Sequence, residues 1–221
     1  MGRDRQVERA ARREALLDAA VACIRREGAG ASMEDIAREA GVTKPILYRH
    51  FRHRADLEDA IATRFTEDIA AQLRNVLRKQ GHPLELLVAA IDSYVRVVER
   101  DTEIYRFLVH GRPSVSSEGA IQSFMRRLGD EIGLVLGERA RELHLDSGPA
   151  EVWGHGIVGM VASSVDWWVD RRVLPRKRLV EFLASLLWGG FRDAMREPRG
   201  SKPDEKAARV ADVIEMPRRK A

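Results

Sequence analysis

The segment SMEDIAREAGVTKPILYRHF, residues 32–51, decides the fold, because it reads as two short helices joined by a tight turn. Ser32 stands before the first helix as a cap, and Asp35 three residues later completes a shortened capping box. A glycine ends that helix, and Thr43 is placed to cap the next one. Pro45 falls in the first turn of the second helix, where its missing N–H has no helical partner to lose. The segment is therefore predicted to form a helix-turn-helix.

The second of these helices has two different faces. At 100° per residue Leu47 and Phe51 fall together, and we expect both to point inward. The opposite face carries Pro45, Ile46 and Arg49, and a hairpin used only for packing has no need to expose such a set. This face suits the major groove of DNA, where the arginine can read a guanine edge and the isoleucine can touch a thymine methyl. A helical hairpin with solvated charges is the alternative.

Residues 9–60 resemble the DNA-binding head of the tetracycline-repressor-like (TetR) family of bacterial transcription regulators. The matching run is SMEDIAREAGVTKPILYRHFRHRADL, residues 32–57, with its Tyr-x-His-Phe close and a basic residue before Ala-Asp-Leu. Position on the helix already favours phosphate contacts for some of these side chains, which set register without reading sequence. The resemblance implies that Ser32 and Thr43 cap onto the backbone and that Tyr48 and His50 bind phosphates. It implies base contacts for Lys44, Pro45, Ile46 and Arg49. Arg54 stands where the family usually has lysine, and the resemblance implies a phosphate contact for it.

The rest of the 221 residues shows helical periodicity and almost no strand alternation, so we expect an all-α protein. The predicted organisation is a three-helix DNA-binding head in residues 1–54, a larger effector-binding and dimerisation body in residues 55–197, and a disordered basic tail in residues 198–221. No apolar run approaches the length of a membrane span without charge. The expected helices cover residues 7–27, 55–80, 84–100, 103–110, 120–143, 150–169 and 175–197, with a loop at SVSSEG, residues 114–119.

Charge and cysteine content agree with an intracellular DNA-binding protein. The formal net charge is +4, and the first 54 residues hold twelve basic against eight acidic side chains, which suggests a polyanion partner, although charge runs are more often solvated faces. The arm RDRQVERAARR, residues 3–13, either orders on DNA or remains a frayed helix start. The lone Cys23 excludes an internal disulfide, fits a reducing cytoplasm, and is expected to be buried.

A single recognition helix touches too few base pairs to specify a site, so a two-fold dimer on a near-palindrome is expected. The apolar residues of the last helix cover a wider part of its circumference than one buried face requires. The helix before it has small residues at spacings that permit another helix to approach closely. The family architecture then implies a four-helix bundle of two helices from each protomer, with packing inside one chain as the alternative. The expected interface residues are Gly156, Gly159, Ser163, Val180, Leu183, Leu187, Trp188 and Phe191.

The body is expected to hold a cavity for a mainly hydrophobic small molecule, which in the family's mechanism favours a conformation with the two heads too far apart for successive grooves. Core packing is the alternative for every lining candidate. His110 and His155 match no metal-ligand spacing, so we expect neither a metal site nor a cofactor. The lining candidates are Tyr94, Val98, Tyr105, Phe107, Leu108, Phe124, Trp153 and Trp167.

The functional expectation is a repressor that an effector releases from a palindromic operator. The alternatives are a DNA-binding regulator without a ligand and a helical protein-interaction module, for which DNA binding would be insensitive to salt and sequence. An enzyme is not expected, because the sequence has no glycine-rich phosphate loop, no His-Glu-x-x-His and no nucleophile elbow.

Overall fold

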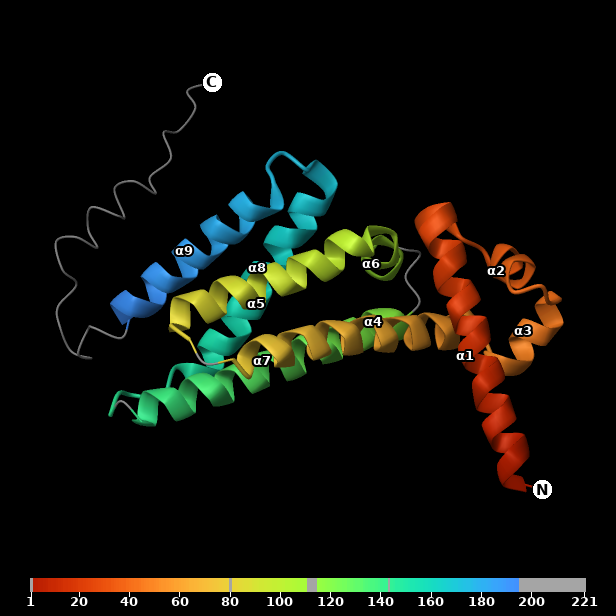
Figure 1. Cartoon of the computed structure of the whole chain (residues 1–221), viewed down its shortest axis with the longest axis horizontal. Coiled ribbons are helices and arrows are strands. Elements are labelled where there is room, and N and C mark those ends of the chain that lie inside the picture. Colours follow the sequence, from red (N-terminus) through yellow and green to blue (C-terminus); the bar gives the residue numbers. More distant parts are fainter. Residues whose placement is uncertain (1, 80, 111–114, 143, 195–221) are drawn as a thin grey trace. The chain divides into compact units, whose positions relative to one another are not determined.

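The computed structural model of the chain describes residues 2–79, 81–110, 115–142 and 144–194, and over these residues every regular element is a helix. The predicted all-α class is thus confirmed (Figure 1). The tail predicted for residues 198–221 lies outside the described residues. The elements are α1 (Gly2–Glu27), the 3-10 turn η1 (Gly28–Gly30), α2 (Met33–Glu39), α3 (Lys44–His50), α4 (Arg54–Leu77), α5 (Pro83–Arg100), α6 (Thr102–Val109), α7 (Val115–Glu142), α8 (Ala150–Arg171) and α9 (Arg176–Ala194).

The first three helices and the start of α4 make up the head. Their apolar faces meet in a core that includes Leu16, Ile24 and Ile36, each at most 2% exposed. Cys23 is fully buried in the same core, as predicted, and burial raises the pKa of its thiol. The guanidinium of Arg13 covers the ring of Phe51, 4.5 Å from its centroid, and closes the core where α3 ends.

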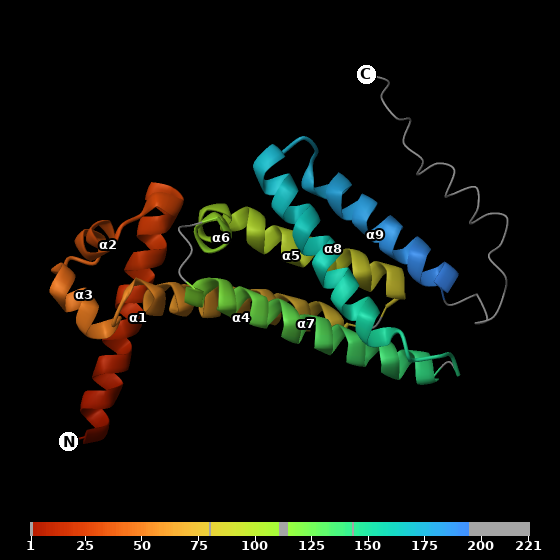
Figure 2. The ribbon, with the colours of Figure 1, turned by 180° about the vertical axis from the view of Figure 1, so that it is seen from behind.

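Residues 1–184 form one compact unit, and Ser185–Ala194, the end of α9, belongs to a second. Within the first unit α4 packs against α1 and also against α5 and α7, and Figures 1 and 2 both show it running from the head along α7. The predicted division at residue 54 therefore falls on the first residue of a helix that serves both head and body. No helix among the described residues is long and apolar enough to cross a bilayer.

The helices α7 and α8 pack with their backbones in contact. A Cβ added to Gly154 of α8 would lie 2.4 Å from the backbone oxygen of Gly129 and 2.6 Å from the backbone nitrogen of Gly133, both on α7. Only glycine permits this approach, since a real Cβ would force the two backbones apart.

Two helices begin earlier in the chain than predicted. The helix α1 starts at Gly2, so the whole basic arm is helical, and α7 starts at Val115 inside the segment expected to be a loop. Serine and glycine lower helix propensity by less than about 1 kcal/mol per residue. Tertiary packing of a 28-residue helix outweighs such a preference at its first turn.

Candidate nucleic-acid interface

The helix α2 is held by the predicted capping box. The Ser32 hydroxyl accepts a hydrogen bond from the Asp35 backbone N–H at 3.2 Å, and the Asp35 carboxylate accepts one from the Ser32 backbone N–H at 3.1 Å. The hydroxyl also donates to the same carboxylate, and these bonds lower the pKa of Asp35. Ser32 therefore acts as a helix cap in this structure, with its only hydroxyl hydrogen already donated.

The turn into α3 requires glycine, because Gly41 adopts a φ of +62° that L side chains rarely adopt. The Val42 backbone N–H then donates to the Ala37 carbonyl at 3.0 Å, which fixes the turn against the end of α2. Behind α3, Leu47 and Phe51 are both 0% exposed, as the helical wheel predicts. The inner face of this short helix is thus anchored in the head core, and this fixes which face points outward.

The outer face of α3 carries the side chains predicted to meet DNA. Thr43 is exposed and makes no capping hydrogen bond, so capping does not occupy its hydroxyl. Tyr48 is exposed at the edge of this face, where its phenol can reach a phosphate. Of the four side chains expected at bases, three are exposed and one is half-buried: Lys44, Pro45 and Arg49 are exposed, and Ile46 is half-buried.

His50 lies at the end of α3 in a strongly basic environment. It is half-buried, and its Nδ1 has no hydrogen-bond partner among the described residues. Burial, followed by the positive charges of Arg9, Arg12, Arg49 and Arg13, lowers the pKa of the imidazole below its usual value. These causes favour the neutral imidazole in the free protein, and a nearby phosphate would oppose the effect of the arginines.

Arg54 makes three contacts within the protein. Its Nε donates to the buried Glu58 at 2.7 Å, its Nη1 donates to the Ala31 carbonyl at 3.2 Å, and its guanidinium stands over the Phe107 ring. These three partners hold the cation at the junction of the head with α6, and its side chain stays 34% exposed. The phosphate contact that the resemblance implies stays a prediction. Phe107, predicted to line an effector cavity, packs at the same junction.

An ionic contact that the sequence does not predict joins the head to the body. Asp101, which is 4% exposed between α5 and α6, accepts hydrogen bonds from Arg25 of α1 at 2.6 and 2.8 Å. Arg100 donates to the other oxygen of the same carboxylate at 2.7 Å and also pairs with Asp68 of α4. Arg25 and Asp101 are 76 positions apart in the chain, so no local sequence pattern predicts this contact.

Most of the predicted effector-lining residues are buried. Tyr105 donates from its hydroxyl to Asp166 at 3.0 Å, and His110 bonds the same carboxylate oxygen at 2.9 Å. The hydroxyl of Tyr94 is buried without a hydrogen-bond partner among the described residues, and burial, followed by the charge of Asp166, raises the pKa of this phenol. Of the predicted set, Tyr94, Val98, Tyr105, Phe107, Leu108 and Phe124 are buried, Trp153 is half-buried and Trp167 is 48% exposed.

The predicted dimer residues divide into two groups. Val180 and Leu183 are 3% and 6% exposed within the protomer, so they belong to its own core, and their assignment to an interface is corrected. Gly156, Gly159 and Ser163 are exposed on α8, and a Cβ at either glycine would meet no atom within 4 Å. In the second unit Leu187 and Trp188 are half-buried, and the side chain of Phe191 lies outside the described residues.

Known protein families match both parts of the chain. The family described as "Bacterial regulatory proteins, tetR family" matches residues 16–61, and "Tetracyclin repressor-like, C-terminal domain" matches residues 72–202. An HTH-type transcriptional regulator of Mycobacterium tuberculosis is 32% identical over 181 residues, which cover 81% of this chain and 77% of the relative. The HTH-type transcriptional activator FasR of Mycolicibacterium smegmatis is 26% identical over 166 residues, covering 73% and 74%.

Solved structures share the fold at lower identity. A tetR-family transcriptional regulator of Streptomyces coelicolor superposes with a TM-score of 0.65 at 20% identity, covering 92% of this chain and 97% of that one. The regulator FadR of Bacillus subtilis, solved in complex with stearoyl-CoA, gives 0.64 at 18% identity, covering 79% and 96%. With the anchored helix-turn-helix and the two family matches, these relatives establish that the chain belongs to the TetR family and is a DNA-binding regulator of transcription.

Proposed function

We propose that this regulator represses transcription as a homodimer bound to a palindromic operator, and that a mainly hydrophobic small molecule releases it. The division of labour would be DNA binding by residues 1–54 and effector binding and dimerisation by residues 55–197, in the cytoplasm with the chromosome. The observation that carries the proposal is the outer face of α3, which is exposed while Leu47 and Phe51 are buried behind it. Such a helix presents its N-terminal half to a major groove.

The DNA contacts follow from the position of each side chain on that face. Arg49 would read a guanine edge, with Lys44, Pro45 and Ile46 beside it at the bases. Thr43, Tyr48 and His50 would bind phosphates, and the cationic environment of His50 would attract the same backbone. Ser32 contributes by capping α2, and its backbone lies at the start of that helix.

Dimerisation would use the exposed face of α8 and the part of α9 in the first unit. Met160 and Trp167 of α8 and Phe182 of α9 are 37%, 48% and 52% exposed, and large exposed apolar side chains can mark a protein–protein interface. Gly156, Gly159 and Ser163 leave open space on α8 for the close approach of a second helix. Leu187, Trp188 and Phe191 remain predicted members of the same interface.

The effector would bind in the body, with its polar group at the cluster formed by Tyr94, Tyr105, His110 and Asp166. The support is the unpartnered hydroxyl of Tyr94 next to a carboxylate that already accepts two hydrogen bonds. Val98, Leu108, Phe124 and Trp153 would supply apolar surface. The ionic contact at Asp101 and the Arg54–Phe107 contact would carry a change in the body to the head.

The test is operator release in solution. With an operator recovered by selection, fluorescence anisotropy is measured while hydrophobic ligands are added, among them long-chain acyl-CoA because FadR was solved with stearoyl-CoA. A ligand that weakens DNA binding, and a Tyr94→Phe variant that responds at a shifted ligand concentration, would support the proposal. If no ligand in a broad lipid and drug panel alters affinity, the protein is a constitutive DNA-binding regulator. Because the relative FasR is named an activator, expression of a reporter gene behind the operator would distinguish repression from activation by this protein.

A further inference from the structure

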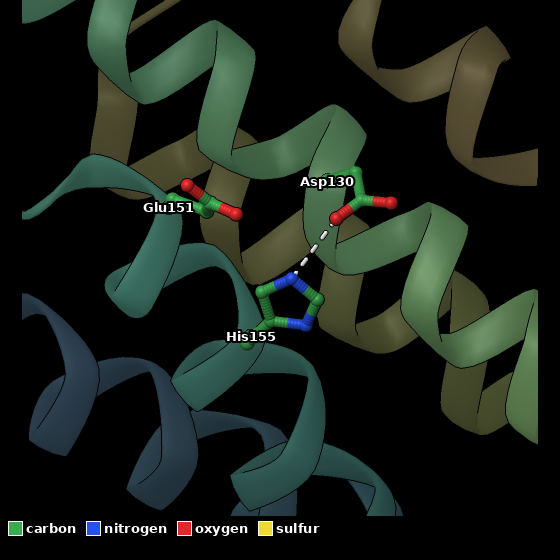
Figure 3. Close-up of side chains that lie close together, drawn as sticks. All are labelled: Asp130, Glu151 and His155. Carbon is green, nitrogen blue, oxygen red and sulfur yellow. Dashed lines mark hydrogen bonds and ion pairs between the residues drawn. The ribbon is translucent and has the colours of Figure 1, made fainter.

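Three side chains able to bind a metal ion meet beside the contact between α7 and α8. Asp130 comes from α7, and Glu151 and His155 come from α8. The Nε2 atom of His155 lies 3.0 Å from an Asp130 carboxylate oxygen, and one ligand atom from each of the three residues lies within 4.8 Å of the other two. Figure 3 shows His155 pointing across to Asp130, with Glu151 nearby on the helix that carries His155.

Glycine makes room for the histidine. A Cβ on Gly129 would lie 2.5 Å from the Nδ1 atom of His155, so the imidazole occupies the space that any other residue at position 129 would fill. Gly154, next to His155 in the chain, lets the two backbones touch at the same level. The backbone that carries the three side chains is thus fixed by close packing and does not depend on the side chains alone.

The donor set is one imidazole nitrogen and two carboxylates, which is a mixed nitrogen and oxygen environment of the kind that Zn²⁺ accepts. With metal–ligand distances of roughly 2.1 Å, two ligand atoms of a tetrahedral site lie about 3.4 Å apart. The His155–Asp130 separation of 3.0 Å is already close to that value. Glu151 is exposed and stands one helical turn before His155, so a rotation about its side-chain bonds can bring its oxygen to the same ion.

We propose that Asp130, Glu151 and His155 form a binding site for Zn²⁺ or a similar divalent transition metal, with water completing the coordination. The ion would link α7 to α8, and α7 in turn packs on α4, the helix that begins in the head. The site uses none of the residues assigned above to the effector or to DNA, so it can be tested independently of the proposed release mechanism. The competing interpretation is a plain ion pair between His155 and Asp130, which does not need Glu151.

The test is isothermal titration calorimetry of the full chain, freed of metal with a chelator, with Zn²⁺ as titrant. The expected result is one Zn²⁺ per protomer, with affinity lowered at least about tenfold in Glu151→Gln and in His155→Gln. Glu131→Gln is the matched control, because it removes the same charge from an exposed neighbour of Asp130 on α7 and should leave affinity unchanged. Loading with Co²⁺ should give the visible absorption of a tetrahedral ion in the wild type, and this absorption should be lost in Glu151→Gln.

Glu151→Gln is the decisive variant, since position 151 is exposed in the first turn of α8 and the change should not disturb folding. Circular dichroism in chelator checks this directly: the wild type and the variant should melt at the same temperature, and added Zn²⁺ should raise Tm only in the wild type. Absence of Zn²⁺ binding to the wild type, or equal binding by Glu151→Gln, would overturn the proposal in favour of the ion pair.

Discussion

In the proposed interface, side chains on α3 would divide between those that read bases and those that bind phosphates. Arg49→Ala should relax base preference at one position of each half-site, because a bidentate contact to guanine is worth about 1–3 kcal/mol of discrimination. Tyr48→Phe should instead weaken binding evenly across sequences, because a phosphate contact carries no sequence information. Anisotropy titrations against the preferred site and its single-base variants measure both effects. If Arg49→Ala kept both preference and affinity, the assigned register of α3 would be wrong.

His50 should make binding and stability depend on pH. The folded protein holds the pKa of His50 below its usual 6.5. The free folded state therefore binds fewer protons than the unfolded chain, and stability declines as pH falls from 6.5 toward the lowered pKa of the folded state. A bound phosphate favours the protonated imidazole, so DNA affinity should rise as pH is lowered from 7 to 6. Urea melts and DNA titrations on His50→Gln should show both dependences reduced. An unchanged pH profile in this variant would exclude His50 as their source.

Burial of the large apolar side chains on α3 can be predicted from the sequence, whereas the contacts of a single cation cannot. The wheel predicts the burial of Leu47 and Phe51 because one short helix has only one way to hide two large apolar groups. The contacts of Arg54 could not be predicted in this way, since a sequence shows that a cation is present and not which carboxylate, carbonyl or ring it will contact. Its partners Ala31 and Phe107 come from segments far apart in the chain.

Among the helices, the α7–α8 pair depends most directly on single residues. Gly154→Ala should destabilise the protein by about 1–3 kcal/mol, because the new Cβ would meet backbone atoms of α7 at 2.4 and 2.6 Å, and backbone cannot move aside as a side chain can. Gly137→Ala is the control from the same helix pair, with its nearest contact at an ordinary 3.5 Å. It should be neutral or stabilising because alanine favours helix. Urea denaturation measures both, and equal effects would contradict the close packing.

Helical periodicity predicts most of the elements but not how their faces pair. Small residues on α8 predict the close approach of another helix, and their spacing suggests Gly156 and Gly159 as the contact points. The structure uses Gly154 for contact with α7 and leaves the other two facing open space. In the same way Val180 and Leu183 belong to an apolar stripe wide enough for two partners, and composition alone cannot divide it between the protomer's core and a second copy.

For the whole molecule, the proposed dimer requires that the exposed apolar residues of α8 and α9 be covered by a second copy. Trp167→Glu should yield a monomer with unchanged helicity and much weaker binding to a palindrome, because a charge placed in an apolar interface lacks a partner there. Leu134→Glu is the control, since Leu134 is 65% exposed on α7 and is not among the residues proposed for the interface. Sedimentation at micromolar concentration measures the outcome, and a wild type that sediments only as a monomer would refute the dimer.

If two copies of the α3 face read DNA together, binding-site selection from random DNA with the purified protein will show it. We predict recovery of a palindrome whose half-site centres are one helical turn or a multiple of it apart, about 10 base pairs per turn. Selection with Arg49→Ala should retain the half-site spacing but lose preference at one position. Selection that recovers no common sequence, or a single half-site without its symmetric partner, would contradict joint reading by two copies.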